Sequence, residues 1–163
     1  MGTHHRGSAR EVKVLDAFIK LARALRAINT RTEKLLAEHG LTETQFGILE
    51  ALFHLGSLRA SDLGSKVLTS SANVTVLADA LGRKGWVKRR RCEADKRVVY
   101  VELTAKGREL IQQVFPEHVG HLLEDFAPLS DAELDVLAHL AKRLGVNTSS
   151  LSRSPRDVTT AGE

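Results

Sequence analysis

The segment that most constrains the fold lies at residues 85–107, GWVKRRRCEADKRVVYVELTAKG. A dense run of basic residues is followed by an apolar stretch rich in β-branched residues, with polar residues between the two. This pattern is typical of two strands joined by a charged tip, here at 86–91 and 98–103. Because an amphipathic segment precedes the hairpin, we expect a helix that leads directly into a cationic wing.

The positive charge of the chain is concentrated in this hairpin. Residues 83–97 contain eight Lys or Arg residues and two Asp or Glu residues, a surplus of six positive charges. The whole chain has a formal net charge of +4, so the remaining residues carry a net charge of −2. A local surplus of this kind is the footprint of a phosphate-binding surface, and it predicts double-stranded DNA as a partner.

Length and composition fit one soluble globular domain. The 163 residues are 42% hydrophobic, which is enough for one core, and no apolar run approaches the roughly 18 residues that a membrane span needs. Cys92 is the only cysteine, so an intrachain disulfide is excluded. We therefore expect a cytoplasmic protein without membrane association.

The sequence carries none of the patterns that accompany catalysis. It has no glycine-rich phosphate loop, no paired acids beside an apolar cleft and no Ser, His and Asp arrangement in a familiar context. We expect neither an enzyme nor a bound cofactor.

Apolar periodicity and capping residues predict a mainly α fold. Ahead of the hairpin we expect helices over four ranges: 11–38, 42–55, 60–67 and about 70–85, the last capped by Thr69 or Ser70. After the hairpin we expect one helix from Thr104 through Phe126, continuing through Pro116, and another from Ser130 to Gly145. The third and fourth helices form a helix-turn-helix.

The expected organisation is a single domain over residues 11–146 between a disordered N-terminus at 1–10 and a disordered tail at 147–163. The winged helix-turn-helix occupies about 41–107. The long helices at 11–38 and 104–146 carry more apolar surface than this lobe can cover, so we expect them to form a homodimer. Two-fold symmetry places two reading helices about one turn of DNA apart and predicts an inverted-repeat operator.

These residues resemble the MarR family of bacterial winged-helix regulators. The resemblance covers roughly residues 11–146 and is carried by the order of the elements and by one motif, Gly85, Arg89, Asp95, Lys96, Arg97, Leu103, Thr104 and Gly107. It implies a homodimer with the fourth helix in the major groove and the wing in the adjacent minor groove. It also implies a repressor that is released by a small, often aromatic and acidic, effector.

Two alternatives remain open at this stage. One is a zinc-responsive regulator of the same fold, with His118 and His121 at helical spacing as weak candidate ligands. Solvated or interface histidines are the simpler interpretation of that pair. The other alternative is a winged-helix module that binds proteins and does not read DNA, although such a module would not need eight cations at its hairpin.

The start and outer side of the fourth helix carry short polar side chains suited to DNA. We expect contacts from five of its residues: Ser70, Ser71, Asn73, Thr75 and Val76. Asn73 is the preferred base reader because its amide can pair with adenine at two points, and Val76 suits a thymine methyl group. Helix capping and simple solvation are the alternative roles.

The wing is expected to supply the cationic contacts. Its DNA-binding residues are Arg89, Arg90, Arg91, Lys96 and Arg97, with Asp95 orienting Arg97 through a charge-assisted hydrogen bond. A guanidinium group at the tip suits the negative potential of a narrow minor groove. Side chains alternate along a strand, so Arg89, Arg90 and Arg91 cannot all face one row of phosphates. The alternative role for Asp95 and Arg97 is a hairpin ion pair without DNA contact.

An effector pocket, if the chain has one, should lie between the first, second and fifth helices. Its candidate contacts are Phe18, Phe46, Phe53, His54 and Phe115, for which core packing is the alternative role. Cys92 lies among arginines, which can lower a thiol pKa, but a lone unreactive wing thiol is the simpler interpretation.

Overall fold

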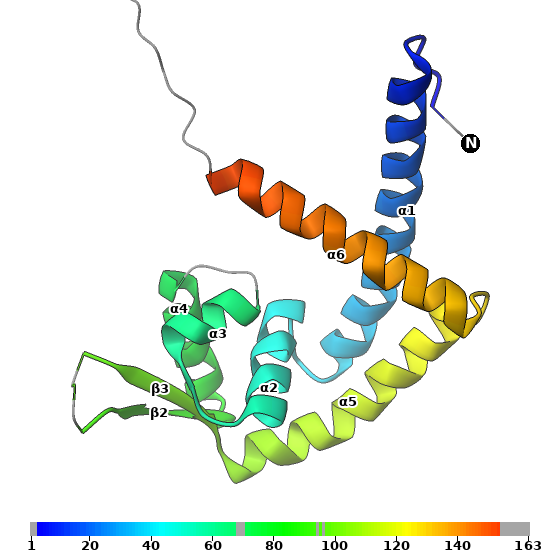
Figure 1. The fold of residues 1–163 in the computed structure, drawn as a ribbon. Helices are drawn as coiled ribbons and strands as arrows, with labels where there is room; N and C mark the ends of the chain where they lie inside the picture. The colour runs from blue at the N-terminus through cyan, green and yellow to red at the C-terminus, as the bar shows by residue number, and fades with distance from the viewer. Residues whose placement is uncertain (1–2, 68–70, 94, 96, 154–163) are drawn as a thin grey trace, which may run out of the picture. The chain divides into compact units, whose positions relative to one another are not determined.

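A computed structural model describes residues 3–67, 71–93, 95 and 97–153 (Figure 1). The chain divides into two compact units, Met1–Glu124 and Asp125–Glu163. The first holds the winged helix-turn-helix and the second holds the last helix. A single domain over residues 11–146 stays a prediction.

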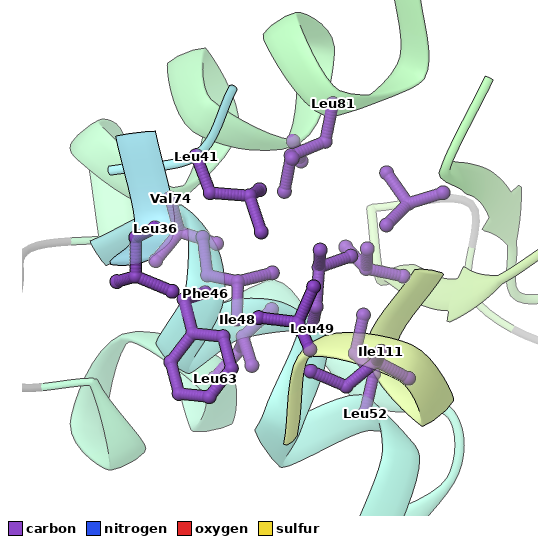
Figure 2. Packing of buried hydrophobic residues seen from close by; sticks show 14 residues of the cluster. Leu36, Leu41, Phe46, Ile48, Leu49, Leu52, Leu63, Val74, Leu81 and Ile111 are labelled. Carbon is purple, nitrogen blue, oxygen red and sulfur yellow. The ribbon is translucent and has the colours of Figure 1, made fainter. Parts of the chain in front are cut away.

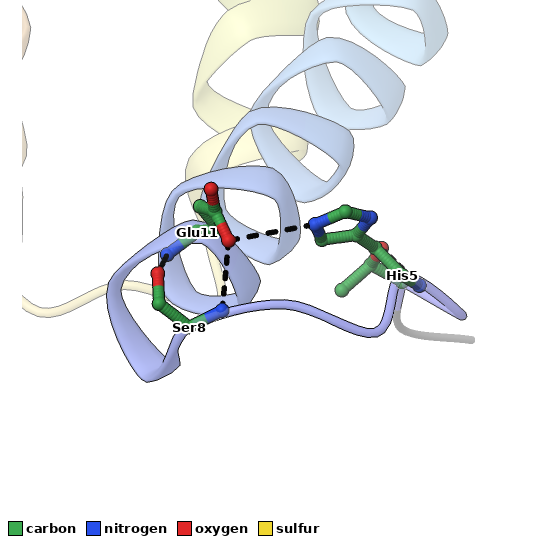
Figure 3. A network of polar contacts seen from close by, with 4 residues as sticks. His5, Ser8 and Glu11 are labelled. Atoms are coloured by element: carbon green, nitrogen blue, oxygen red, sulfur yellow. Dashed lines mark hydrogen bonds and ion pairs between the residues drawn. The ribbon is translucent and has the colours of Figure 1, made fainter.

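Helix α1 (Ala9–Glu38) begins two residues before the predicted start. Figure 3 shows the reason, which is a reciprocal cap: the Ser8 hydroxyl accepts from the Glu11 N–H at 3.3 Å, and the Glu11 carboxylate accepts from the Ser8 N–H at 2.7 Å. The hydrogen bonds from Ser8 lower the pKa of Glu11. The expectation that all of residues 1–10 are disordered is therefore wrong for Ser8 to Arg10, because capping satisfies the free N–H groups of the first turn.

Helix α2 (Glu43–Leu55) has the predicted boundaries. Thr42 and Gln45 form the capping box, and Gly56 ends the helix with a φ of 77°. This backbone conformation is readily available to glycine because it has no Cβ. Gly40, which follows α1, has a positive φ of 68° as well.

The helix-turn-helix consists of α3 (Ala60–Lys66) and α4 (Ser71–Arg83). Residues 68–70 lie outside the described residues, so the predicted cap at Thr69 or Ser70 remains a prediction. Gly85, with a φ of 75°, follows α4 and turns the chain into the wing.

A three-stranded antiparallel sheet contains the wing. Strands β2 (Val87–Arg91) and β3 (Val99–Leu103) form the predicted hairpin, and the strand order is β1-β3-β2. Strand β1 (Leu58–Arg59) was not expected. It has only two residues, too few for alternation to be visible, and its pairing with β3 depends on residues distant in the sequence.

One hydrophobic core joins α1, α2, α3, α4, the sheet and α5 (Ala105–Phe126). Figure 2 shows its side chains converging from these elements, with α2 supplying Phe46, Ile48, Leu49 and Leu52. Leu36, Leu63, Leu81 and Ile111 are completely buried around them. The core thus holds α4 and the wing together in one lobe.

Helix α6 (Asp131–Arg153) begins after Ser130 as predicted but continues eight residues beyond Gly145. The predicted end at Gly145 and the predicted disorder of residues 147–153 are therefore wrong. A glycine ends a helix when it adopts a positive φ, and Gly145 is not among the glycines with that conformation in the described chain. The rest of the predicted disordered tail, residues 154–163, lies outside the described residues.

Candidate nucleic-acid interface

Helix α4 has an inner and an outer face of different chemistry. Val74, Ala78 and Leu81 are buried in the core, which turns the opposite face outward. That face carries Asn73, which is exposed, and Val76, which is 64% exposed. A hydrogen-bonding amide beside an exposed apolar group matches the mixture of polar edges and methyl groups in a major groove.

The other predicted residues of this helix are Thr75, Ser71 and Ser70. Thr75 is half-buried. Ser71 begins α4, but its side chain lies outside the described residues, as does Ser70 altogether. The predicted DNA contacts of these residues stay predictions.

The wing tip is organised by Asp95. Its carboxylate accepts a hydrogen bond from the Arg97 backbone N–H at 3.0 Å and from Arg97 Nε at 3.1 Å. Backbone bonds from Val98 to Asp95 and from Cys92 to Val98 close the tip. The hydrogen bonds from Arg97 lower the pKa of Asp95, so the carboxylate stays charged.

The predicted contact between Asp95 and Arg97 is thus present. The Arg97 side chain is 92% exposed, so its guanidinium group stands in solvent at the tip. Lys96 lies outside the described residues. Whether the tip enters DNA stays a prediction.

Strand alternation divides the three consecutive arginines. Arg89 lies on the face of the sheet with Val87 and Val101, and its Nη1 contacts Asp79 Oδ1 of α4 at 2.5 Å. Arg90 lies on the opposite face, 3.3 Å from Glu102. Arg91 ends β2 with an exposed side chain.

The outer face of the sheet carries a group that was not predicted. Tyr100 is paired in register with Arg59 of β1 and with Arg90 of β2, and both guanidinium groups lie against its ring, at 6.0 Å and 5.2 Å from the centroid. The Arg59 Nε also donates to the Tyr100 hydroxyl at 3.4 Å. The two arginines are attracted to the electron-rich face of the ring. The contact of Arg90 with Tyr100 lies within the predicted hairpin, whereas that of Arg59 depends on the unpredicted pairing of β1.

The base of the wing is locked to α5 by the Thr104 and Gly107 motif. The Thr104 hydroxyl donates to the Gly85 carbonyl at 2.6 Å and accepts from the Gly107 N–H at 3.0 Å, capping α5. A Cβ on Gly107 would lie 1.9 Å from the Trp86 carbonyl oxygen, so glycine is required for this close approach. Lys84 links the base of the wing to the turn after α1. Its ammonium donates to the Gly40 carbonyl at 2.6 Å and lies over the Trp86 ring.

The structure brings together three of the five residues predicted for an effector pocket. The His54 ring lies edge-on to Phe53 and Phe115, at centroid distances of 5.1 Å and 4.9 Å. Phe46 is instead buried in the core, and Phe18 is 66% exposed on α1. The predicted ligand contacts of all five remain predictions.

A groove of about 480 Å³ lies along α2 and the end of α3. Of the five predicted pocket residues, only His54 contributes to its wall. The lining residues are Glu43, Thr44, Gly47, Glu50, Ala51, His54, Leu55, Lys66 and Val67.

His118 and His121 face the interior from α5. The His118 ring lies edge-on to Phe46 at 4.9 Å, and burial lowers the pKa of His118 despite the nearby carboxylate of Glu50. The Nδ1 atoms of both histidines are buried and have no hydrogen-bond partner in the described part of the chain. Nor does that part hold a group of three His, Cys, Asp or Glu side chains suited to a metal ion.

None of the described helices combines the length and the apolarity that crossing a membrane requires. The lobe formed by α2, α3, α4 and the β2–β3 hairpin defines a winged helix-turn-helix, a class in which one helix and the wing present cations to DNA.

Comparisons with known proteins identify the family. The model of the MarR family matches residues 41–99. The chain is 36% identical over 135 residues to the HTH-type transcriptional regulator MhqR of Bacillus subtilis, which covers 83% of this chain and 93% of that protein. The chain belongs to the MarR family and is a transcriptional regulator, a DNA-binding protein rather than an enzyme.

Solved structures have the same fold. Sco3205 of Streptomyces coelicolor, a MarR family regulator in complex with DNA, aligns with a TM-score of 0.78 at 20% identity over 88% of this chain and 91% of that one. NadR in complex with 4-hydroxyphenylacetate aligns with a TM-score of 0.68 at 24% identity over 88% of this chain and 97% of that one. At these identities the likeness extends to the fold alone.

Proposed function

We propose that the protein binds an inverted-repeat operator as a homodimer, with α4 in the major groove and the wing in the adjacent minor groove. The observation that carries the proposal is that α4 and the cationic hairpin lie on one lobe, with a polar reading face on the helix and an oriented, exposed guanidinium group at the wing tip. The complex of Sco3205 with DNA supports it through the shared fold.

The roles of the contacts follow from their chemistry. Asn73 reads one adenine and Val76 contacts a thymine methyl group, which together give sequence preference. Arg97, held by Asp95, enters a narrow minor groove, where the potential is most negative in A/T-rich DNA. Arg91 adds phosphate attraction that positions the lobe without reading sequence.

A homodimer accounts for the apolar residues that α1 exposes. Val14, Phe18, Leu21 and Leu25 recur at intervals of three and four, so they form a stripe along one side of the helix. Helix α6 has an exposed stripe of its own, with Val136, Leu137, Leu140 and Leu144. Apolar stripes of this kind need a partner, and a second copy of the chain also provides the second α4 that an inverted repeat requires.

The regulator acts as a repressor that a small aromatic or acidic effector releases from DNA. A dimer bound across a promoter excludes other proteins from the same duplex. An effector that prefers a dimer with wrongly spaced reading helices weakens DNA binding by its differential affinity. The structure of NadR with 4-hydroxyphenylacetate, and the contacts of His54 with Phe53 and Phe115, support an effector of this chemistry.

The test is selection of bound duplexes from a random pool, followed by binding measurements on the selected duplex. We expect an inverted repeat, and an affinity that falls with salt at a log–log slope of about −5 to −9, for about six to ten neutralised phosphates. Asn73→Ala should relax preference at one base position, at a cost of about 1–3 kcal/mol.

Arg97→Ala should weaken binding most on duplexes with A/T-rich flanks, whereas Arg10→Ala, an equal charge change at the exposed start of α1, should not. A flat salt dependence, or equal loss on every sequence from Asn73→Ala, would reject the proposal.

A further inference from the structure

An ion pair links α4 to the wing. Asp79 lies near the end of α4 and Arg89 lies in the middle of β2, and their side chains contact at 2.5 Å. Arg89 points toward α4 because it is paired in register with Val101, which is buried on the inner face of the sheet. The bond thus spans the two elements that would enter neighbouring grooves.

Asp79 places a negative charge beside the cationic wing. A negative charge at this position opposes the attraction of the wing to DNA phosphates. It neutralises an arginine of the segment at residues 83–97, which carries a surplus of six positive charges. If Asp79 only reduced DNA affinity, it would bring no advantage at this position. It brings an advantage if it fixes the direction of the wing.

We propose that Asp79 and Arg89 are positioning residues, which set the direction of the wing relative to α4 so that the reading helix and Arg97 meet their grooves together. Arg89 acts through Asp79 and does not bind phosphate. The inference rests on the proposed function and refines it, because it removes Arg89 from the predicted phosphate contacts. The pair is partly exposed, with 38% of the Arg89 side chain accessible, so its effect on folding stability is small.

Asp79 could position the wing or merely repel phosphate, and these two roles predict opposite changes in operator affinity for the variant Asp79→Ala. Asp79→Ala removes a negative charge beside DNA and keeps a strong helix former in α4, so electrostatics alone predicts tighter binding. Positioning predicts that affinity for the selected operator falls by about fivefold, the upper range for an exposed ion pair, while affinity for random duplex rises or stays unchanged. Arg89→Gln should weaken operator binding by a similar factor.

Three controls separate the roles. Glu93→Ala makes the same charge change at an exposed wing residue and should not weaken operator binding. Arg91→Gln makes the same charge change as Arg89→Gln two residues along β2. Because a homodimer carries Arg91 twice, Arg91→Gln should make the salt slope shallower by about two units, whereas Arg89→Gln should leave it unchanged. The swapped double variant, Asp79→Arg with Arg89→Asp, should recover operator affinity to within about twofold of the wild type, beyond the sum of its single changes.

Thermal unfolding of each variant checks that the lobe is intact. Tighter operator binding by Asp79→Ala, or no recovery in a folded double variant, overturns the inference while leaving the proposed function standing. A wild type that fails to distinguish the selected duplex from random DNA overturns both.

Discussion

At the scale of single residues, Gly107 is a position that has no room for a side chain. Its Cα lies so close to the wing that any Cβ would meet the backbone carbonyl of Trp86 and not a movable side chain. The sequence motif includes Gly107, but the reason that glycine is needed there is its close approach to Trp86, 21 residues earlier in the chain. Gly107 and Thr104 therefore lock the wing base onto α5.

We predict that Gly107→Ala lowers the free energy of unfolding by about 1–3 kcal/mol or more, because the first turn of α5 must move away from Trp86. Denaturant unfolding measures the change. Gly120→Ala is the matched control, since it lies in the same helix with no atom within 4 Å of its Cβ position, and it should stabilise the protein by up to about 1 kcal/mol. Equal effects of the two variants would contradict the close approach.

At the scale of elements, the local signals succeeded where a boundary depends on nearby residues. These signals, which are apolar periodicity, capping residues and β-branched residues, predicted α2 and the hairpin correctly. They failed for β1, whose two residues form a strand only by pairing with β3, and for Gly145, where glycine alone did not end α6. The side chains of the β2 arginines were predicted to alternate between the two faces of the sheet. The acidic partner of Arg89 was not predicted, because Asp79 belongs to another element.

The packing of α5 against α2 through His118 makes stability depend on pH. Burial lowers the pKa of His118 below its ordinary value of 6.5, so the neutral ring is favoured in the folded protein. The unfolded chain then binds the proton more readily, and this contribution to stability is complete above pH 6.5 and is lost as the pH falls through 6.5 toward the folded pKa.

We predict that the free energy of unfolding decreases between pH 7.5 and 5.5, and that His118→Gln makes this decrease smaller. Denaturant unfolding at a series of pH values gives the slope. His139→Gln, at an exposed residue of α6, is the control and should leave the slope as it is in the wild type. An unchanged slope in His118→Gln would show that another group is responsible.

At the scale of the whole molecule, the apolar residues that the lobe does not cover indicate the assembly. Phe18 is 66% exposed on α1, in line with other exposed apolar residues of that helix. Covering such a stripe with a second copy removes apolar surface from water, and an acidic residue at its centre would be placed in an unfavourable environment.

We predict that the wild type is a dimer at micromolar concentration and that Phe18→Glu weakens dimerisation by at least about tenfold. Light scattering gives the mass, and circular dichroism checks that helicity is retained. Leu55→Glu makes a similar change at a 53% exposed residue of α2 and should remain dimeric. A dimeric Phe18→Glu variant would place the interface elsewhere.

The sequence by itself determined the helical pattern, the hairpin, the caps of α2 and the concentration of positive charge, because periodicity, capping and charge are properties of neighbouring residues. It also carried the motif that identifies the family. The local contact of Asp95 with Arg97 also followed from the sequence. Only the tertiary structure decided the partners of the strand arginines: Arg89 meets Asp79 of α4, and Arg90 meets Tyr100 and Glu102. The partners of Arg89 and Arg90 are set when a strand packs beside a helix and pairs with another strand, and local sequence does not encode those distances.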